Sequence, residues 1–86
     1  MSTVSIHELK VFQLFRDNPG DWMSSQQVAK RTRIAPRTAR LHCSGLAEVG
    51  ILDEAKVFPG FRYRLCPTAG DRPYYSNLDA AEEALS

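Results

Sequence analysis

Cysteine is scarce in this sequence, and its two residues, Cys43 and Cys66, form no C-x-x-C pair. Neither they nor His7 and His42 reach a spacing that is typical of a zinc site. The sequence therefore predicts no metal ion and no cofactor. Both thiols are expected to be free and buried, and a redox-sensing disulfide between them is the alternative.

Long apolar runs are also missing. No segment approaches the ~20 consecutive apolar residues that cross a bilayer, and the N-terminus lacks the pattern of a signal peptide. We therefore expect a cytoplasmic protein without a membrane partner. Glycine-rich phosphate loops and motifs that pair a nucleophile with a base are absent as well. Neither an enzyme nor a small-molecule ligand is predicted.

Acidic residues are absent from the whole interval between Asp21 and Glu48, which contains five Lys or Arg residues. The net charge of +1 hides this, because residues 1–70 hold ten Lys or Arg against six Asp or Glu, whereas residues 71–86 hold one Arg against four acids. A whole-chain charge understates such a basic segment. The pattern favours a polyanionic partner.

Two helices with a tight connection are predicted within this basic segment. Ser24 followed by Gln27 has the spacing of a capping box, so the first helix should begin after Ser24. Residues 32–35 form the turn. Pro36 suits the first position of the second helix, because a proline lacks only an N–H that would have no partner there.

The second helix, at about 36–49, has two distinct faces. Gly50 is expected to end it as a left-handed residue, with Ile51 touching Leu46 across a Schellman cap. One face is apolar and should pack in the core; it carries Ala39, Cys43, Leu46 and Val49. The opposite face is polar and carries Arg37, Thr38, Arg40 and Ser44.

This pair of helices resembles the helix-turn-helix core of winged-helix DNA-binding domains, of the kind found in small bacterial, archaeal and phage transcription regulators. The resemblance covers about residues 5–66 and includes Arg62-Tyr63-Arg64-Leu65 as the second strand of the wing. Ala35 and Cys43 depart from the pattern. The family usually has Ser or Thr in place of Ala35 and Leu in place of Cys43. The resemblance implies an α+β, winged helix-turn-helix fold. Its parts would be a three-helix core, a two- to three-stranded β-wing and a short C-terminal helix.

Ser5 and Glu8 suggest another capping box, so a first helix should start near Ile6 and end at Asn18-Pro19-Gly20. Its apolar stripe should contain Ile6, Leu9, Phe12 and Phe15. In the winged-helix pattern, residues 21–23 form a brief strand that pairs with the wing, and Trp22 would cover the end of the core.

The wing is expected over about 53–65. Pro59-Gly60 suits the centre of a type II turn, in a loop somewhat longer than two residues. Beyond it, apolar residues that should face the core alternate with Arg62 and Arg64, which should be exposed. Phe58, near the tip, is either a hydrophobic contact or a residue folded under the loop.

The length suits one small domain. We expect a winged helix-turn-helix domain at 1–66, then a connector and a short acidic C-terminal helix or tail at 67–86. Ser76 is the expected cap of that last helix, and its stripe of Leu78, Ala81 and Leu85 is too small to stabilise a helix in water. A homodimer through this segment is expected, with docking on its own first helix as the alternative.

The predicted function is sequence-specific binding of double-stranded DNA, most simply by a transcriptional regulator. Arg37 and Arg40 are candidates for bidentate contacts with guanine in the major groove. The wing would contact the backbone or the minor groove. The alternative is a winged-helix module for protein–protein interaction without DNA binding. The complete set of expected DNA-binding residues is Lys30, Arg31, Arg33, Arg37, Thr38, Arg40, Ser44, Lys56, Arg62 and Arg64.

Overall fold

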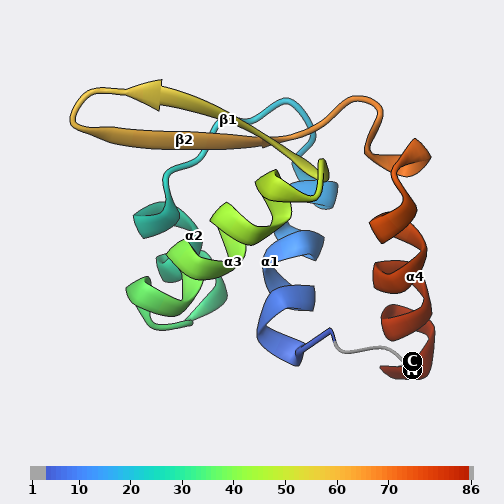
Figure 1. Ribbon diagram of the computed structural model, residues 1–86. Helices are drawn as coiled ribbons and strands as arrows, with labels where there is room; N and C mark the ends of the chain where they lie inside the picture. Colours follow the sequence, from blue (N-terminus) through green and yellow to red (C-terminus); the bar gives the residue numbers. More distant parts are fainter. Residues whose placement is uncertain (1–3, 86) are drawn as a thin grey trace.

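Four helices and one β-hairpin make up residues 4–85, the part of the chain that the computed structural model describes (Figure 1). Figure 1 shows the hairpin lying across one end of the helices, with α1 between α3 and α4. The α+β winged helix-turn-helix fold predicted from the sequence is confirmed. The elements in chain order are α1 (Ile6–Asp17), α2 (Ser25–Thr32), α3 (Pro36–Glu48), β1 (Leu52–Val57), β2 (Gly60–Leu65), a 3-10 turn η1 (Ala69–Asp71) and α4 (Pro73–Leu85).

The predicted capping box is complete at the start of α2, whereas at α1 only its serine half is formed. Ser24 Oγ accepts a hydrogen bond from the N–H of Gln27 at 3.1 Å, and Gln27 Oε1 accepts one from the N–H of Ser24 at 2.9 Å. This capping box is complete. At α1, Ser5 Oγ accepts from the N–H of Glu8 at 3.1 Å, while the Glu8 carboxylate accepts a hydrogen bond from the hydroxyl of Tyr74 in α4. The cap of α1 is thereby joined to the last helix.

Both ends of the connection to α3 are fixed by backbone conformation. Arg33 ends α2 in the left-handed region, with φ +58°, and turns the chain sharply. Pro36 then opens α3, as predicted, and no side chain caps this helix at Ala35. These features set the angle between the two helices of the motif.

The end of α3 is the predicted Schellman cap. Gly50 has φ +84°, its N–H donates to the carbonyl of Ala47 at 3.1 Å, and the N–H of Ile51 donates to the carbonyl of Leu46 at 2.9 Å. A Cβ atom at residue 50 would also stand only 3.1 Å from the Arg72 side chain. Glycine is therefore favoured here mainly for its left-handed conformation, and a larger residue would also have to displace the flexible Arg72 side chain.

One apolar core unites all four helices and the hairpin, with Phe12 and Phe15 of α1 as its largest buried side chains. Two predicted members are exposed. Ile6 is 55% exposed, because it stands nine residues, or two and a half helical turns, before Phe15 and so faces the opposite way. Val49 is exposed because it follows the last helical residue of α3, at the edge of the buried stripe.

Both cysteines are free and buried, as predicted. Burial raises the pKa of the Cys43 thiol to about 12, so the thiol is neutral near pH 7 and packs as a small apolar side chain. Cys66 Sγ lies 3.4 Å from the hydroxyl oxygen of Thr68. The alternative of a disulfide between the two cysteines is not realised.

The hairpin has a two-residue loop. Its antiparallel register runs from Leu52 opposite Leu65 to Val57 opposite Gly60, which leaves Phe58-Pro59 as the loop, joined by a cis peptide bond. The predicted type II turn and longer loop are wrong, because Gly60 already belongs to β2 and Pro59 takes the second loop position.

The brief strand predicted at 21–23 is a single bridge. The backbone N–H groups of Met23 and Tyr63 each donate to the carbonyl of the other residue at 2.8 Å. Met23 is the buried residue of this segment, and Trp22 is exposed. The prediction that Trp22 covers the core is wrong, because successive side chains of an extended segment point to opposite sides.

The last helix, α4, begins at Pro73 and not after Ser76, so it has 13 residues. Proline is well suited to a first helical position. The helix packs on α1: the ring of Tyr75 meets Phe12 edge-to-face with centroids 5.5 Å apart, and Arg16 Nη1 donates to Glu82 at 2.5 Å. Hydrogen bonds from Arg16 and from Gln13 lower the pKa of Glu82.

This packing changes the expectation for the tail. Leu78 is completely buried and Ala81 is nearly so, both within the same core as α1 and α3. Leu85, the third member of the predicted stripe, is exposed. The apolar stripe is thus covered by the chain's own first helix, which was the alternative to a dimer contact. The buried part of this stripe is therefore not available for a dimer contact.

We predict that Leu78→Ala will lower the free energy of unfolding by about 2–5 kcal/mol, because it leaves a cavity between α4 and the core. Leu85→Ala is the matched control in the same helix. Leu85 is 60% exposed, so its loss should change the free energy of unfolding by less than about 0.5 kcal/mol. Urea denaturation measures both. Two equally small effects would contradict the docking of α4.

Candidate nucleic-acid interface

The polar face of α3 is turned away from the core. Arg37, Arg40 and Ser44 are exposed, as predicted, whereas Thr38 is half-buried beside the buried stripe. Leu41 also lies on the exposed face and is 68% exposed. The accessible surface of α3 therefore combines two guanidinium groups with one large apolar side chain.

A groove of about 470 Å³ separates this face from the hairpin. Its walls are the start of α2, the start of α3 and the tip-side half of β2. Arg37 and Arg40 line it from α3, and Arg62 lines it from β2. None of the described residues that line it is an Asp or Glu. We call it the basic groove. It brings together cations that lie more than 20 positions apart in the sequence.

The helix ends at the basic groove strengthen its preference for anions. Ser24, Ser25 and Gln26 line it at the N-terminus of α2, and Pro36 lines it at the N-terminus of α3. The N-terminus of a helix carries unpaired N–H groups and the positive end of the helix dipole. Two such ends, beside three arginines, favour phosphate oxygens.

Tyr63 joins the basic groove to the core. It is buried, pairs with Met23 through the backbone and lies opposite Glu54 in the hairpin register. Burial, followed by a hydrogen bond with Glu54, raises the pKa of Tyr63 to about 12. Its hydroxyl group is therefore protonated at neutral pH, and the residue belongs to the common buried core.

Several predicted contact residues lie outside the basic groove. Lys30, Arg31 and Arg33 are exposed along and just after α2, and Arg31 Nη1 lies 3.6 Å from Met23 Sδ. Lys56 is exposed on β1, opposite Phe61. None of these four cations lines the groove.

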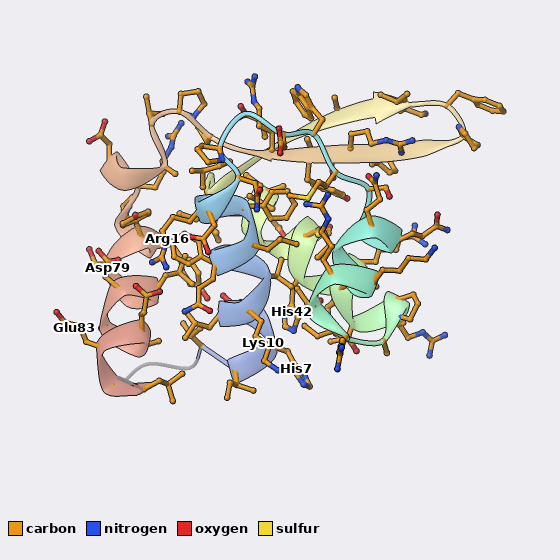
Figure 2. All side chains as sticks on the ribbon, turned by 180° about the vertical axis from the view of Figure 1, so that it is seen from behind. His7, Lys10, Arg16, His42, Asp79 and Glu83 are labelled. Carbon is orange, nitrogen blue, oxygen red and sulfur yellow. The ribbon has the colours of Figure 1, made fainter. Side chains whose placement is uncertain are left out.

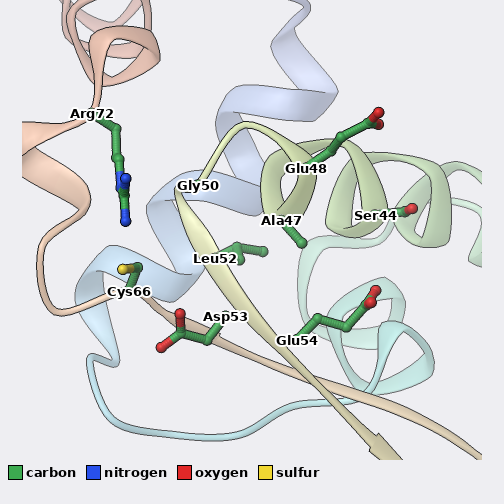
Figure 3. A pocket seen from close by; sticks show the side chains of 9 residues that line it. All are labelled: Ser44, Ala47, Glu48, Gly50, Leu52, Asp53, Glu54, Cys66 and Arg72. Atoms are coloured by element: carbon green, nitrogen blue, oxygen red, sulfur yellow. The ribbon is translucent and has the colours of Figure 1, made fainter.

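Ser44 lies in a different setting. It lines a second pocket of about 450 Å³ on the other side of the hairpin base, together with Glu48, Asp53 and Glu54 (Figure 3). The lining of this pocket contains three carboxylates and one guanidinium, that of Arg72, so this end of α3 is less attractive to phosphate than the basic groove. The favourable surface for a polyanion is thus the N-terminal half of α3.

Arg64 is engaged inside the protein. Its Nη2 lies 3.0 Å from Asp53 Oδ2, and its guanidinium carbon lies 4.6 Å from the centroid of the Trp22 ring. Its Nε is buried and has no hydrogen-bond partner. This side chain was expected to be exposed and to contact DNA. Instead it connects both strands of the hairpin base to the segment before α2.

Sequence reasoning left two exposed apolar residues without a role on this face. Leu41 falls outside the three- and four-residue spacing of the buried stripe, and that spacing could have identified it. Phe58, at the hairpin tip, is 92% exposed, which excludes the interpretation that it folds under the loop. Only the structure could decide between its two interpretations.

The side of the molecule seen in Figure 2 carries acidic as well as basic side chains. Figure 2 shows the molecule from behind the view of Figure 1, with Asp79 and Glu83 on α4 and with His7 and Lys10 on α1. Among residues 4–85, no three His, Cys, Asp or Glu side chains gather closely enough to hold a metal ion. Within the same range, no helix has the length and apolar character that a bilayer crossing requires.

Solved structures of three proteins share this fold. A possible transcriptional regulator from Methanosarcina mazei Go1 has a TM-score of 0.71 at 15% identity, over 95% of this chain and 70% of that one. The YusO protein from Bacillus subtilis has a TM-score of 0.67 at 13% identity, over 95% of this chain and 57% of that one. The structure of the ferric uptake regulator from Francisella tularensis with iron has a TM-score of 0.66 at 18% identity, over 76% of this chain and 54% of that one.

These likenesses establish the fold, a winged helix-turn-helix that transcription regulators also adopt. The matched region spans little more than half the length of the ferric uptake regulator and of YusO. No protein-family model and no curated protein matches the sequence. The function has to be argued from the groove itself.

We predict that Arg64→Ala will lower the free energy of unfolding by about 1 kcal/mol, the size of a partly exposed ion pair together with a cation–π contact. Arg62→Ala is the control on the same strand. It should change stability by less than about 0.5 kcal/mol. Thermal denaturation compares the two, and an Arg62 variant that is the less stable one would contradict our assignment of Arg64.

Proposed function

We propose that this chain binds double-stranded DNA sequence-specifically and acts as a transcriptional regulator. The observation that carries the proposal is the basic groove, where Arg37, Arg40 and Arg62 meet two helix N-termini and none of the described lining residues is an Asp or Glu. Two of the fold neighbours are described as regulators, which agrees with this function.

In the proposed complex, the N-terminal half of α3 enters the major groove, which is about 12 Å wide and admits a helix. Arg37 and Arg40 each donate two hydrogen bonds to the O6 and N7 atoms of a guanine. Leu41 directly follows Arg40 in α3 and is exposed, and it contacts the methyl group of a thymine. These three side chains would read the base sequence.

The other cations set the position of the protein on the duplex. Lys30, Arg31, Arg33 and Lys56 are exposed, and Arg62 lines the basic groove, so these five side chains are the proposed phosphate contacts. Thr38 and Ser44 remain candidates for contacts at the edge of the interface. Arg64 acts in the proposal by holding the hairpin base, and not mainly as a phosphate ligand.

A homodimer belongs to the same proposal. One module reads only a short half-site. A two-fold symmetric pair of copies reads both half-sites of a palindrome and is therefore more specific. The contact between the two copies would lie outside the buried stripe of α4, because α1 covers that stripe.

The interaction-module alternative loses its main support in the tail. Tyr74 and Tyr75 are the aromatic residues that the tail could offer to a protein partner, yet both are half-buried. Tyr74 hydrogen-bonds Glu8, and Tyr75 packs on Phe12, so both serve the attachment of α4 to α1. We therefore favour DNA as the partner.

We predict that duplex affinity falls steeply with salt concentration. With about four to six phosphate contacts per copy, a log–log plot of the binding constant against salt should have a slope of roughly −4 to −5, because condensed counterions are released. Selection from random duplexes supplies the site, and fluorescence anisotropy at increasing salt measures the slope. A slope near zero would remove the DNA proposal.

Arginines on the two walls of the basic groove should differ in their effects. Arg37→Ala and Arg40→Ala should each reduce discrimination between the selected site and a site with its guanines replaced, by roughly 1–3 kcal/mol per lost base contact. Arg62→Ala should weaken binding to both duplexes about equally. If Arg62→Ala relaxes specificity while the α3 variants do not, the wing reads the sequence instead.

A further inference from the structure

The tip of the hairpin presents apolar side chains to solvent. Phe58 is 92% exposed, Val57 before it is also exposed, and Pro59 completes the loop. The loop has only two residues, so it is too short for the Phe58 side chain to fold beneath it. Figure 1 shows the hairpin projecting past the ends of α2 and α3, so none of the helices covers its tip. The most exposed aromatic ring of the described chain thus stands at the far end of an arm.

Cations flank this apolar tip on both strands. Lys56 precedes it on β1 and Arg62 follows it on β2. Residues 55–63 contain no Asp or Glu. An aromatic ring between two cations fits a partner that has anionic groups at its surface and an apolar interior behind them. The base stack of duplex DNA, reached between two phosphate backbones, has this character.

The tip is continuous with the basic groove. Pro59, Gly60 and Phe61 line that groove together with Arg37 and Arg40 of α3. A strand of six residues is roughly 20 Å long, at about 3.3 Å per residue. The major groove that would hold α3 is about 12 Å wide, so the hairpin can extend past one backbone to the adjacent minor groove.

We propose that Phe58 is an apolar wedge that enters the minor groove beside α3 and partly unstacks one base-pair step, while Lys56 and Arg62 hold the flanking phosphates. This inference rests on the proposed DNA binding and gives the wing tip a specific task. Wedges of this kind kink the duplex, and flexible pyrimidine–purine steps admit them most easily. The wing would thereby favour sites with such a step at a fixed distance from the guanines that α3 contacts.

The test uses the full chain and its selected duplex, with 2-aminopurine placed at successive positions on the wing side. The fluorescence of this base rises when it loses stacking. With the unmodified protein, we expect a rise at one step only. Phe58→Ala should abolish the rise and weaken binding about tenfold, the size of one lost base–aromatic contact. It should leave the salt slope unchanged, because no charge is lost.

Three controls make the result specific. Phe58→Trp should keep the fluorescence rise, because it retains a large aromatic ring. Lys56→Ala should keep the rise but make the salt slope shallower by about 1. Circular dichroism should show Phe58→Ala folded, since the residue is exposed.

The outcomes separate the two proposals. The unmodified protein could bind tightly without a fluorescence change at any step, and Phe58→Ala could bind with the same affinity. This pair of results would overturn the wedge and leave the proposed DNA binding intact. Failure of both proteins to bind any duplex overturns both proposals. Binding to phosphatidylserine vesicles that Phe58→Ala abolishes, without any effect of this substitution on duplexes, assigns the tip to a lipid surface and overturns the wedge.

Discussion

The burial of the aromatic face of α1 is the interaction on which the rest of this structure depends. Phe12 and Phe15 are completely buried, and α1 stands between α3 on one side and α4 on the other. Because α3 gives its apolar stripe to this core, its arginines have to face solvent. Because α4 covers the opposite side, the apolar residues Leu78 and Ala81 are also removed from water. A single packing requirement thus creates both the exposed basic face and the docked tail.

Charge is distributed to match this packing. Among the described residues, the arginines with ion-pair partners are Arg16, which binds Glu82 across α1 and α4, and Arg64, which binds Asp53 at the hairpin base. Both pairs lie away from the basic groove and hold elements together. The acids thus neutralise structural cations, while Arg37, Arg40 and Arg62 lie where no acid lines the groove. A weak overall charge is therefore compatible with a strongly basic local surface.

The hairpin combines a fixed base with a projecting tip. Tyr63 is paired with Met23 through two backbone hydrogen bonds, and Arg64 packs over Trp22, so the base is tied to the segment that leads into α2. The tip has no such contacts, and its ring at Phe58 faces solvent. This arrangement fixes the angle of the wing relative to α3 and leaves the end of the wing available to a partner. It suits a surface that contacts one rigid ligand at two separate places.

The sequence by itself determined the helix-turn-helix motif. Ser24 with Gln27, Pro36 and Gly50 act through hydrogen bonds and backbone preferences that span five residues or fewer, so their pattern could be interpreted without knowing the rest of the chain. The basic segment could be identified in the same way, because charges are counted along the sequence. The α+β winged fold followed from these local signals together with the family resemblance.

Only the tertiary structure decided which side chains stay exposed or free. Leu78 and Leu85 were expected in one apolar stripe of the last helix, yet the first is buried and the second is exposed. The difference is which part of that helix is covered by other elements. Arg62 and Arg64 are equivalent in an alternating strand, but only Arg64 meets Asp53 and Trp22. Such outcomes depend on contacts between residues distant in the sequence, and spacing along one segment carries no record of them.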